Sequence, residues 1–279
     1  MIREIFVPLL HAASDNCALD VAMAMARAHD AQVSALVTLE HPMPLVTEFG
    51  NVPVEVSQRQ LEQVRADAEV LATQAREHLA RGDVAHDVRL TDVMLLWSEE
   101  TAALQARHTD LSVLGRPDPV DITPRFALTF KSLLLQSGRP VMVVPNGARL
   151  AFPSRRVVVA WQPTREATRA LHDALPLLSR DSEIDVLMVD PQIAEGRHGD
   201  EPGADIARHL ARHGFQVRVV PLPRRDANEG ITLLRHVAEV KADLLVMGGY
   251  GHSRWREVVL GGTTRTVLHD ANTPVLFSH

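Results

Sequence analysis

The sequence predicts an α/β protein with two tandem doubly wound, Rossmann-like domains, each a five-stranded parallel sheet with helices on both faces. Three observations predict this fold: short apolar runs alternate with amphipathic helical stretches, the same landmarks occur twice in one order, and a glycine-rich loop follows a strand near residue 248. Strands that alternate with helices are typical of βαβ units, and right-handed crossovers place the helices on both faces of a parallel sheet.

An internal repeat defines the domain organisation. Three pairs of segments match in order: residues 5–8 with 157–160, 110–115 with 243–248, and 139–144 with 273–277. Turn-forming residues cluster between Pro145 and Pro153, where the copies join. We therefore expect a first domain over residues 1–148 and a second over 155–279.

Hydrophobic periodicity places the elements within each copy. In the second copy, strands are expected at about 156–161, 184–190, 216–221, 243–248 and 274–278, with helices at about 164–178, 202–213, 228–240 and 262–270. In the first copy, apolar residues three or four apart predict an amphipathic helix over 61–79 that Gly82 ends. Residues 41–56 contain three prolines and read as a surface loop, with a lid or docking loop as the alternative.

Composition excludes several classes of function. The net charge of −6 gives no attraction to nucleic acid, so none is expected as a partner. No apolar stretch approaches the length of a membrane span, and the first residues do not resemble a signal peptide. The single cysteine, Cys17, excludes an internal disulfide and favours a reducing compartment, the cytoplasm.

The glycine-rich loop is the main candidate site. The apolar run 244–247 leads into Gly248, Gly249 and Gly251, and nine further residues separate Gly251 from Gly261 and a second helical stretch. A glycine loop between a strand and a helix N-terminus presents free N–H groups and a positive dipole end, which suit phosphate. The spacing differs from both the P-loop and the dinucleotide-binding fingerprint.

This order of features resembles the nucleotide-binding loop of the universal stress protein family. The resembling features are an acidic strand start at Asp243, Met247 with Gly248, the split glycines, a helix, and a Pro-Val strand at 274–277. The resemblance is firm over 155–279 and looser over 1–148. It implies an ATP-binding stress-response protein, with contacts from Gln162, Met188, Met247, Gly248, Tyr250, Gly251, Gly261, Gly262, Thr263 and Thr264.

Two positions depart from the family pattern. Gln162 stands where the first strand usually ends in aspartate, and Gly262 stands where serine or threonine is usual, although Thr263 and Thr264 follow at once. Gln162 keeps a donor and an acceptor but lacks the charge. An empty strand-to-helix turn that has lost its ligand is therefore the alternative interpretation of this loop.

The first copy has a degenerate site. Leu10 stands at the acidic position, and Pro117 and Pro119 follow Gly115 where a second glycine and N–H donors are needed. No metal site is expected, since His209 and His213, four apart on a helix, supply only two ligands.

The sequence thus predicts a cytoplasmic universal stress protein that binds one adenine nucleotide in its second domain. No general base accompanies the glycine loop, so the chain is not expected to be a dedicated enzyme, with weak ATPase activity or autophosphorylation as the upper limit. The apolar strands near 140–144 and 274–277 predict an intrachain pseudo-dimer, with a homodimer as the other arrangement. The alternative functions are an interaction scaffold with both sites inactive, and an adenylyl-transferring enzyme of related fold.

Overall fold

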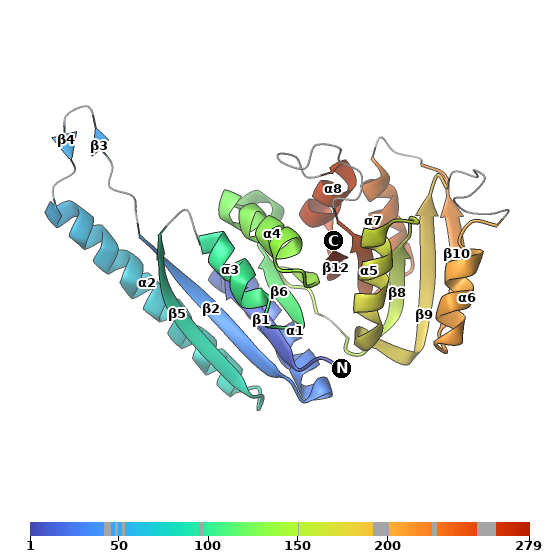
Figure 1. Cartoon of the computed structure of the whole chain (residues 1–279), viewed down its shortest axis with the longest axis horizontal. Helices are drawn as coiled ribbons and strands as arrows, with labels where there is room; N and C mark the ends of the chain where they lie inside the picture. Colours follow the sequence, from blue (N-terminus) through green and yellow to red (C-terminus); the bar gives the residue numbers. More distant parts are fainter. Residues whose placement is uncertain are drawn as a thin grey trace. The chain divides into compact units, whose positions relative to one another are not determined.

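The computed structural model describes residues 1–41, 46–47, 50–51, 54–94, 98–149, 151–191, 201–224, 228–249 and 261–279. The chain divides into two compact units, each considered by itself (Figure 1). The N-terminal unit contains residues 2–117 and 122–139, and the C-terminal unit contains residues 118–121 and 140–279 with residue 1. Among the described helices, none has the length and apolar character needed to cross a membrane.

The N-terminal unit is built on a parallel sheet in the order β5-β2-β1-β6. Its larger elements are β1 (Glu4–Leu9), α1 (Ala12–His29), β2 (Gln32–His41), α2 (Val54–Ala80), β5 (His86–Met94), α3 (Ser98–Ala106), β6 (Leu111–Arg116) and α4 (Pro124–Gln136). Two short strands, β3 (Val46–Thr47) and β4 (Gly50–Asn51), pair antiparallel. The segment predicted as a loop over residues 41–56 therefore includes this strand pair and the beginning of α2.

The C-terminal unit has a sheet in the order β10-β9-β8-β11-β12-β7, parallel except for β7. Its elements are β7 (Val141–Pro145), β8 (Ser154–Ala160), α5 (Arg165–Ala174), β9 (Leu178–Val189), α6 (Ala204–Arg212), β10 (Gln216–Leu222), α7 (Glu229–Glu239), β11 (Leu244–Gly248), α8 (Gly262–Asp270) and β12 (Val275–Ser278). Two 3₁₀ turns, Pro119–Asp121 and Leu175–Leu177, complete the unit. From β8 the chain adds β9 and β10 on one side of the sheet and then β11 and β12 on the other side, so the order of strands reverses between β8 and β11. Ligands of doubly wound sheets bind at this switch point.

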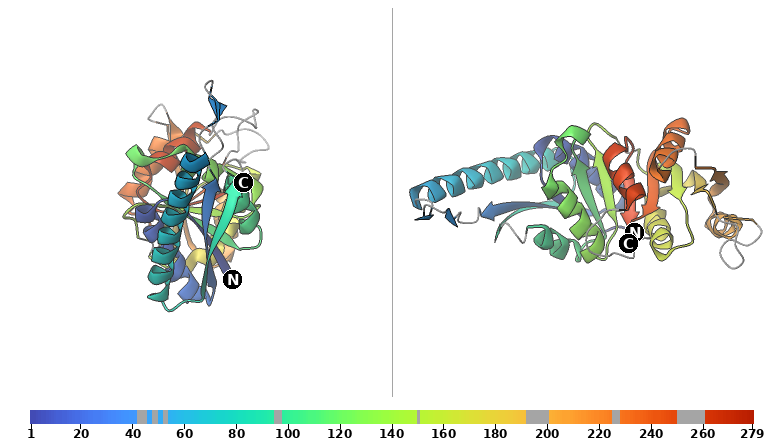
Figure 2. Two further views of the ribbon diagram at one scale, coloured as in Figure 1. Left: turned by 90° about the vertical axis from the view of Figure 1, so that its left-hand side faces the viewer. Right: turned by 90° about the horizontal axis from the view of Figure 1, so that it is seen from above.

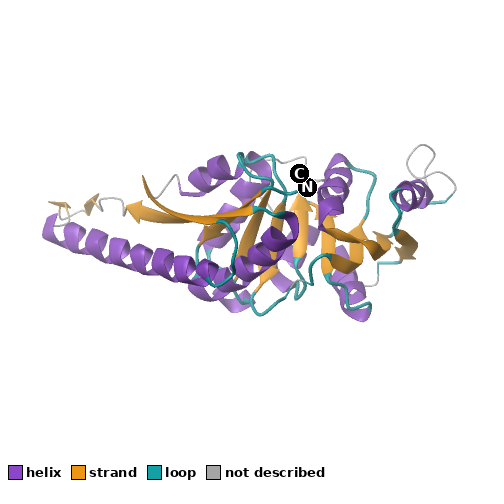
Figure 3. Ribbon diagram, turned by 90° about the horizontal axis from the view of Figure 1, so that it is seen from below, coloured by secondary structure: helices purple, strands orange, loops and turns teal. Residues whose placement is uncertain are grey.

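Helices cover both faces of the sheet in each unit, as Figure 3 shows. In the N-terminal unit α1 contacts α2 and α3 contacts α4, and α2 runs along β2 and β5 (Figure 2). In the C-terminal unit α7 contacts α8, while α5 packs on β11 and β12. The α/β fold with doubly wound sheets predicted from the sequence is confirmed.

Alanine, valine and leucine fill most of the core. The strands β1, β6, β7, β11 and β12 are almost wholly buried, so their near-continuous apolar sequences match the pattern of parallel strands covered on both faces. The few aromatic core residues include Phe126 and Phe130 on α4 and Phe277 on β12. Small side chains on α1 and α5, such as Ala18, Ala22 and Ala170, allow these helices to approach the sheet closely.

The last strands of the two repeats pair with each other within the C-terminal unit. Strand β12 runs antiparallel to β7, with Val275 opposite Val143 and Phe277 opposite Val141. The sequence predicts pairing between these two apolar segments, and the structure contains it. The pairing covers an edge of β12 that would otherwise expose unpaired backbone groups.

In each repeat, an aspartate just before one strand hydrogen-bonds to the start of a neighbouring strand: Asp110 joins β6 to β1, and Asp243 joins β11 to β8. The Oδ2 atom of Asp110 accepts hydrogen bonds from the backbone N–H groups of Arg3 and Glu4 at 2.6 and 3.1 Å. The Oδ2 atom of Asp243 accepts from those of Arg155 and Arg156 at 3.0 and 2.9 Å. The acidic strand starts that mark the sequence repeat therefore have the same structural role in both halves.

A buried carboxylate stands at the beginning of α1. Asp15 is 1% exposed, and its Oδ2 atom accepts a hydrogen bond from the His11 backbone N–H at 2.7 Å. Its Oδ1 atom is buried with no hydrogen-bond partner among the described atoms. Burial raises the pKa of Asp15 to about 7, against the lowering effects of backbone hydrogen bonds from His11 and Leu10 and of the Arg125 charge.

The raised pKa of Asp15 predicts that the free energy of unfolding depends on pH between about 4 and about 7. Because its pKa is raised in the folded state, the native protein binds more protons than the unfolded chain, so this stabilisation is complete below about pH 4 and is lost as the pH rises to about 7. The shift corresponds to a loss of about 4 kcal/mol. Urea unfolding across this range should show a smaller decrease in Asp15→Asn, and an identical pH profile in both proteins would refute the assignment.

Candidate functional site

A cavity of about 260 Å³ opens at the switch point of the C-terminal unit. Its walls come from the ends of β8, β9 and β11 and from the first turns of α5, α7 and α8; the lining residues are Ala160, Trp161, Gln162, Thr164, Glu166, Ala167, Leu187, Val189, Glu229, Leu233, Met247, Gly248, Gly261, Gly262, Thr263 and Thr264. Three helix N-termini therefore meet at the carboxyl ends of the strands. Each N-terminus directs the positive end of its helix dipole to the cavity.

Gly248 is required by the approach of α5 to β11. A Cβ atom on Gly248 would lie 2.7 Å from the backbone nitrogen of Ala167 and 2.9 Å from the Cβ of Glu166. The same contact occurs in the first repeat, where a Cβ atom on Gly115 would lie 2.4 Å from the backbone oxygen of Ser14. A glycine at this position is thus explained by packing alone, because it occurs in both halves.

The N-terminus of α8 opens onto the cavity. Gly261 is its N-cap, and no side chain accepts a hydrogen bond from the first N–H groups of this helix in the part of the chain that the structure describes. A Cβ atom on Gly261 would meet no described atom within 4 Å. These N–H groups, those of Thr263 and Thr264 included, are therefore available to an anionic ligand.

Asn228 holds two of the helix N-termini together. Its Oδ1 atom caps α7 by accepting a hydrogen bond from the Gly230 N–H at 2.8 Å. Its Nδ2 atom donates to the Gly262 carbonyl oxygen at 3.2 Å and to the Thr266 Oγ1 atom at 2.5 Å. This side chain fixes the relative position of α7 and α8 at the cavity.

Two carboxylates line the same cavity. Glu229, the first residue of α7, accepts a hydrogen bond from the Thr263 Oγ1 atom at 3.5 Å. Glu166 lies in the first turn of α5, and its side chain is only 11% exposed. No lysine or arginine is among the lining residues within the described part of the chain. Among the described lining residues, attraction for an anion comes from backbone N–H groups.

The structure brings most of the sequence-predicted site residues together. Seven line the cavity: Gln162, Met247, Gly248, Gly261, Gly262, Thr263 and Thr264. Met188 is not among the lining residues; its side chain lies against Gly203, and the alternation of β9 turns it to the other face from Leu187 and Val189. Tyr250 and Gly251 lie outside the described residues, as do the basic residues Arg254 and Arg256.

Sequence reasoning missed several cavity residues. Glu166 and Thr164 read in the sequence as ordinary first-turn and N-cap residues, and Thr164 does accept a hydrogen bond from the Ala167 N–H at 3.3 Å. Three apolar lining residues belong to no sequence motif: Leu187, Val189 and Leu233. The available signal was the position of Val189 at the end of β9, of Leu187 two residues before it, and of Leu233 four residues after Glu229 on α7.

The corresponding crevice of the N-terminal unit is filled by its own side chains. Helix α4 begins at Pro124, with Thr123 as its N-cap. Measured back from the strand that follows each helix, β7 or β12, α4 begins about one helical turn earlier than α8. In this extra turn, Arg125 donates a hydrogen bond to the Oγ1 atom of Thr38 at 2.8 Å, and Thr38 contacts the Ser98 hydroxyl at 3.1 Å. The strand register makes Thr38 the counterpart of the cavity residue Val189.

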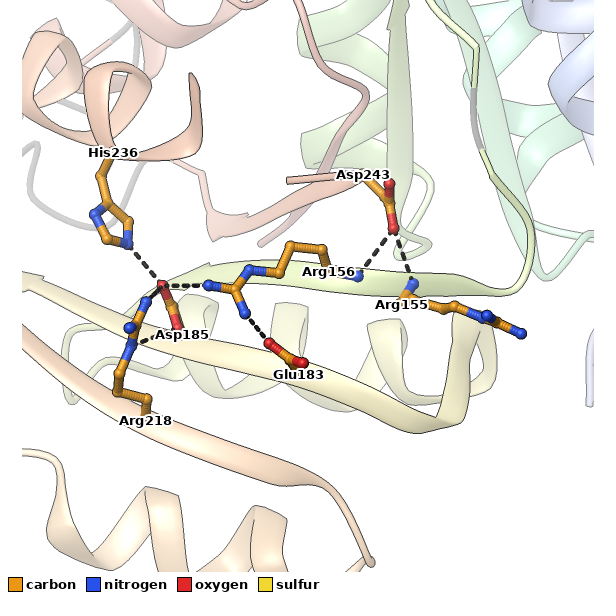
Figure 4. A network of polar contacts seen from close by, with 7 residues as sticks. All are labelled: Arg155, Arg156, Glu183, Asp185, Arg218, His236 and Asp243. Carbon is orange, nitrogen blue, oxygen red and sulfur yellow. Dashed lines mark hydrogen bonds and ion pairs between the residues drawn. The ribbon is translucent and has the colours of Figure 1, made fainter. Parts of the chain in front are cut away.

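A polar network fixes α7, one wall of the cavity, to the sheet (Figure 4). Asp185 on β9 is 2% exposed; its carboxylate accepts hydrogen bonds from the Arg218 guanidinium at 2.7 and 3.0 Å and contacts the His236 Nε2 atom at 2.8 Å. Burial acts to raise the pKa of Asp185, but hydrogen bonds from Arg218 and His236 and the charges of Arg218 and Arg156 outweigh it and lower the pKa. His236 lies on α7 seven residues after Glu229.

Three histidine rings from α5 and the C-terminal end of α6 lie against one another in tilted and edge-to-face arrangements. The rings of His209 and His213 have centroids 4.8 Å apart, and His172 of α5 lies 5.3 Å from His209. Burial lowers the pKa of His209, and the neighbouring His213, His172 and Arg212 lower it further. Among the described residues, no group of three histidine, cysteine or acidic side chains is arranged to hold a metal ion.

Gly248→Ala should destabilise the protein by about 1–3 kcal/mol because its methyl group would collide with the α5 backbone. Gly262→Ala is the matched control, since the nearest described atom to a Cβ there is 3.9 Å away. Urea unfolding should show no loss, or a slight gain, in the control. Equal stability of the two variants would disprove the packing role of Gly248.

Asp185→Asn should cost about 3 kcal/mol, because it leaves Arg218 and His236 without their buried partner. Asp205→Asn removes an ion pair with Arg208 from a side chain that is 95% exposed, and should cost less than about 1 kcal/mol. Guanidinium unfolding of both variants at neutral pH measures the difference. A cost for Asp185→Asn as small as that for Asp205→Asn would show that the network does not anchor α7.

Comparison with known proteins relates the part of the chain that contains this cavity to a family. The sequence model of the Universal stress protein family matches residues 153–279, the half that contains the cavity. A universal stress protein of Synechocystis sp. is 42% identical over 67 residues, which are 24% of this chain. The chain spans only 22% of the length of that relative.

Solved structures resemble the chain over its whole length. A universal stress protein from Archaeoglobus fulgidus DSM 4304 superposes with a TM-score of 0.72 at 14% identity, covering 99% of this chain and 97% of that one. A functionally unknown protein from Pseudomonas aeruginosa PAO1 gives a TM-score of 0.57 at 15% identity, covering 99% of this chain and 92% of that one. At these identities the likeness concerns the fold alone. The family model matches residues 153–279, so the C-terminal part of the chain is similar to the universal stress protein family.

Proposed function

We propose that this protein binds one adenine nucleotide, ATP, in the cavity of its C-terminal unit and acts as a regulatory stress-response protein. The observation that carries the proposal is the N-terminus of α8, whose first N–H groups have no side-chain partner among the described residues and border a cavity at the switch point of the sheet. The split-glycine spacing that resembles the family's nucleotide-binding loop ends at the same Gly261.

The cavity walls are suited to the two parts of a nucleotide. Apolar side chains, including Trp161, Leu187 and Leu233, provide a surface for the base, while the α8 N-terminus provides donors for the phosphates. A mostly apolar pocket with a few convergent polar groups is the usual form of a small-molecule site.

The proposal includes one site for each chain. Arg125 occupies the first-repeat crevice through its hydrogen bond to Thr38, so a nucleotide would have to displace that contact. The protein is proposed to be cytoplasmic, in keeping with its single cysteine, to form an intrachain pseudo-dimer through the β12–β7 pairing, and to have no nucleic-acid partner.

A non-nucleotide-binding interaction scaffold is the second candidate. The two lining carboxylates, Glu166 and Glu229, favour it because each opposes an anionic ligand. The scaffold function predicts that neither ATP nor adenosine binds at millimolar concentration.

Gly261→Val provides the test. The valine side chain would enter open space without touching described protein atoms, so the fold should persist, but it would block phosphates from the α8 N-terminus. Calorimetric titration should show one ATP site in the wild type and an affinity loss of about tenfold or more in the variant, while adenosine, which has no phosphates, should bind both proteins alike.

Thermal melting with and without ATP gives an independent measurement. No ATP-dependent rise in melting temperature in the wild type would leave the scaffold as the function. A rise that Gly261→Val does not alter would move the nucleotide to another site, and a stoichiometry of two would contradict the closed first-repeat crevice.

A further inference from the structure

We propose that Glu166 is the specificity-determining residue of the cavity, and that its carboxylate accepts hydrogen bonds from donor groups on the nucleoside part of the ligand. The proposal rests on the proposed nucleotide site and names the residue that would select among nucleotides. The donors on an adenine nucleoside are the ribose hydroxyl groups and the exocyclic amine of the base.

The first observation is the position of Glu166, which lies in the cavity wall and is largely shielded from solvent. Its side chain is 11% exposed, and its one ionic contact among the described residues is with Arg165 at 3.5 Å, whose own side chain is 86% exposed. Such an ion pair at the surface contributes little. A buried carboxylate is costly unless donors satisfy it, and the cavity beside it is where such donors can enter.

The second observation is the contrast with the first repeat. The position equivalent to Glu166 is Ser14, since Gly248 and Gly115 make the same close contact with these two residues. Ser14 donates its hydroxyl hydrogen to the His11 carbonyl oxygen at 3.2 Å, so it is satisfied within its own helix turn. An acidic residue at this exact position is therefore specific to the half with the open cavity, whereas the first repeat has its buried carboxylate one position later, at Asp15.

Favourable interaction with the α5 dipole explains part of the choice of glutamate, but an exposed side chain in the first turn would serve that purpose equally well. Burial in the cavity wall needs a further reason. The Glu166 carboxylate also orients the ligand, because a carboxylate repels phosphate and attracts hydrogen-bond donors. The phosphates thus belong at the α8 N-terminus, and the nucleoside belongs at Glu166.

The experiment combines ligand analogues with two matched variants. Wild type, Glu166→Gln and Glu229→Gln are titrated with ATP, 2′,3′-dideoxy-ATP and inosine triphosphate; the first analogue lacks the ribose hydroxyls, and the second lacks the exocyclic amine. The wild type should prefer ATP to at least one analogue by about tenfold, the effect of a hydrogen bond to a charged group. The analogue that loses affinity identifies the donor.

Glu166→Gln keeps an acceptor but loses the charge, so it should weaken this preference, whereas Glu229→Gln, which removes the same charge from the same cavity, should keep it. An undiminished preference in Glu166→Gln would overturn the inference, as would equal wild-type affinity for all three ligands. An equal gain in affinity for all three in Glu166→Gln would show simple repulsion and would also overturn it. In each of these cases ATP still binds and the proposed function stands; only the absence of ATP binding to the wild type would remove both.

Discussion

The close contact between the end of β11 and the first turn of α5 determines the geometry of the cavity. Gly248 leaves room for the Ala167 backbone and the Glu166 side chain at distances that no other residue permits. The contact brings Thr164, Glu166 and Ala167 to the cavity wall. Asn228 and the Asp185 network then fix α8 and α7 around the same space. The N–H groups of α8 can act together with these walls only because the sheet and the three helices are held at fixed positions.

The same contact in the N-terminal unit leads to a different result. Gly115 packs against Ser14 as Gly248 packs against Glu166, so the packing of the strand end on the helix is equivalent in the two units. The difference arises at α4, whose extra first turn, capped by Thr123, carries Arg125 into hydrogen-bond contact with Thr38. The buried Asp15, where the second repeat has Ala167, adds a second polar group. The extra helix turn and the Arg125–Thr38 contact thus occupy the position of the open crevice, which accounts for the asymmetry between repeats of one fold.

The fold followed from the sequence because its signals are local and repeated. Apolar runs of four to six residues, amphipathic helices and the acidic strand starts Asp110 and Asp243 each have a direct physical meaning. The site was only partly predictable. Glycines mark positions where backbone approaches backbone or a ligand, and Gly248 and Gly115 belong to the first kind, which spacing alone does not distinguish. Glu166 was missed because an acidic residue in a first turn is ordinary, and its burial depends on contacts between distant segments.

The electrostatics of the cavity show how such a site can be selective without being strongly attractive. Its described lining offers helix N–H groups but no basic side chain, and it contains Glu166 and Glu229. Dipole ends and backbone donors stabilise an anion only at short range and in fixed geometry, whereas a carboxylate repels it at longer range. A phosphate is therefore favoured only when it reaches the α8 N-terminus, and other placements in the cavity are disfavoured. Repulsion of this kind lowers overall affinity for an anion but restricts the orientation in which an anion can lie in the cavity.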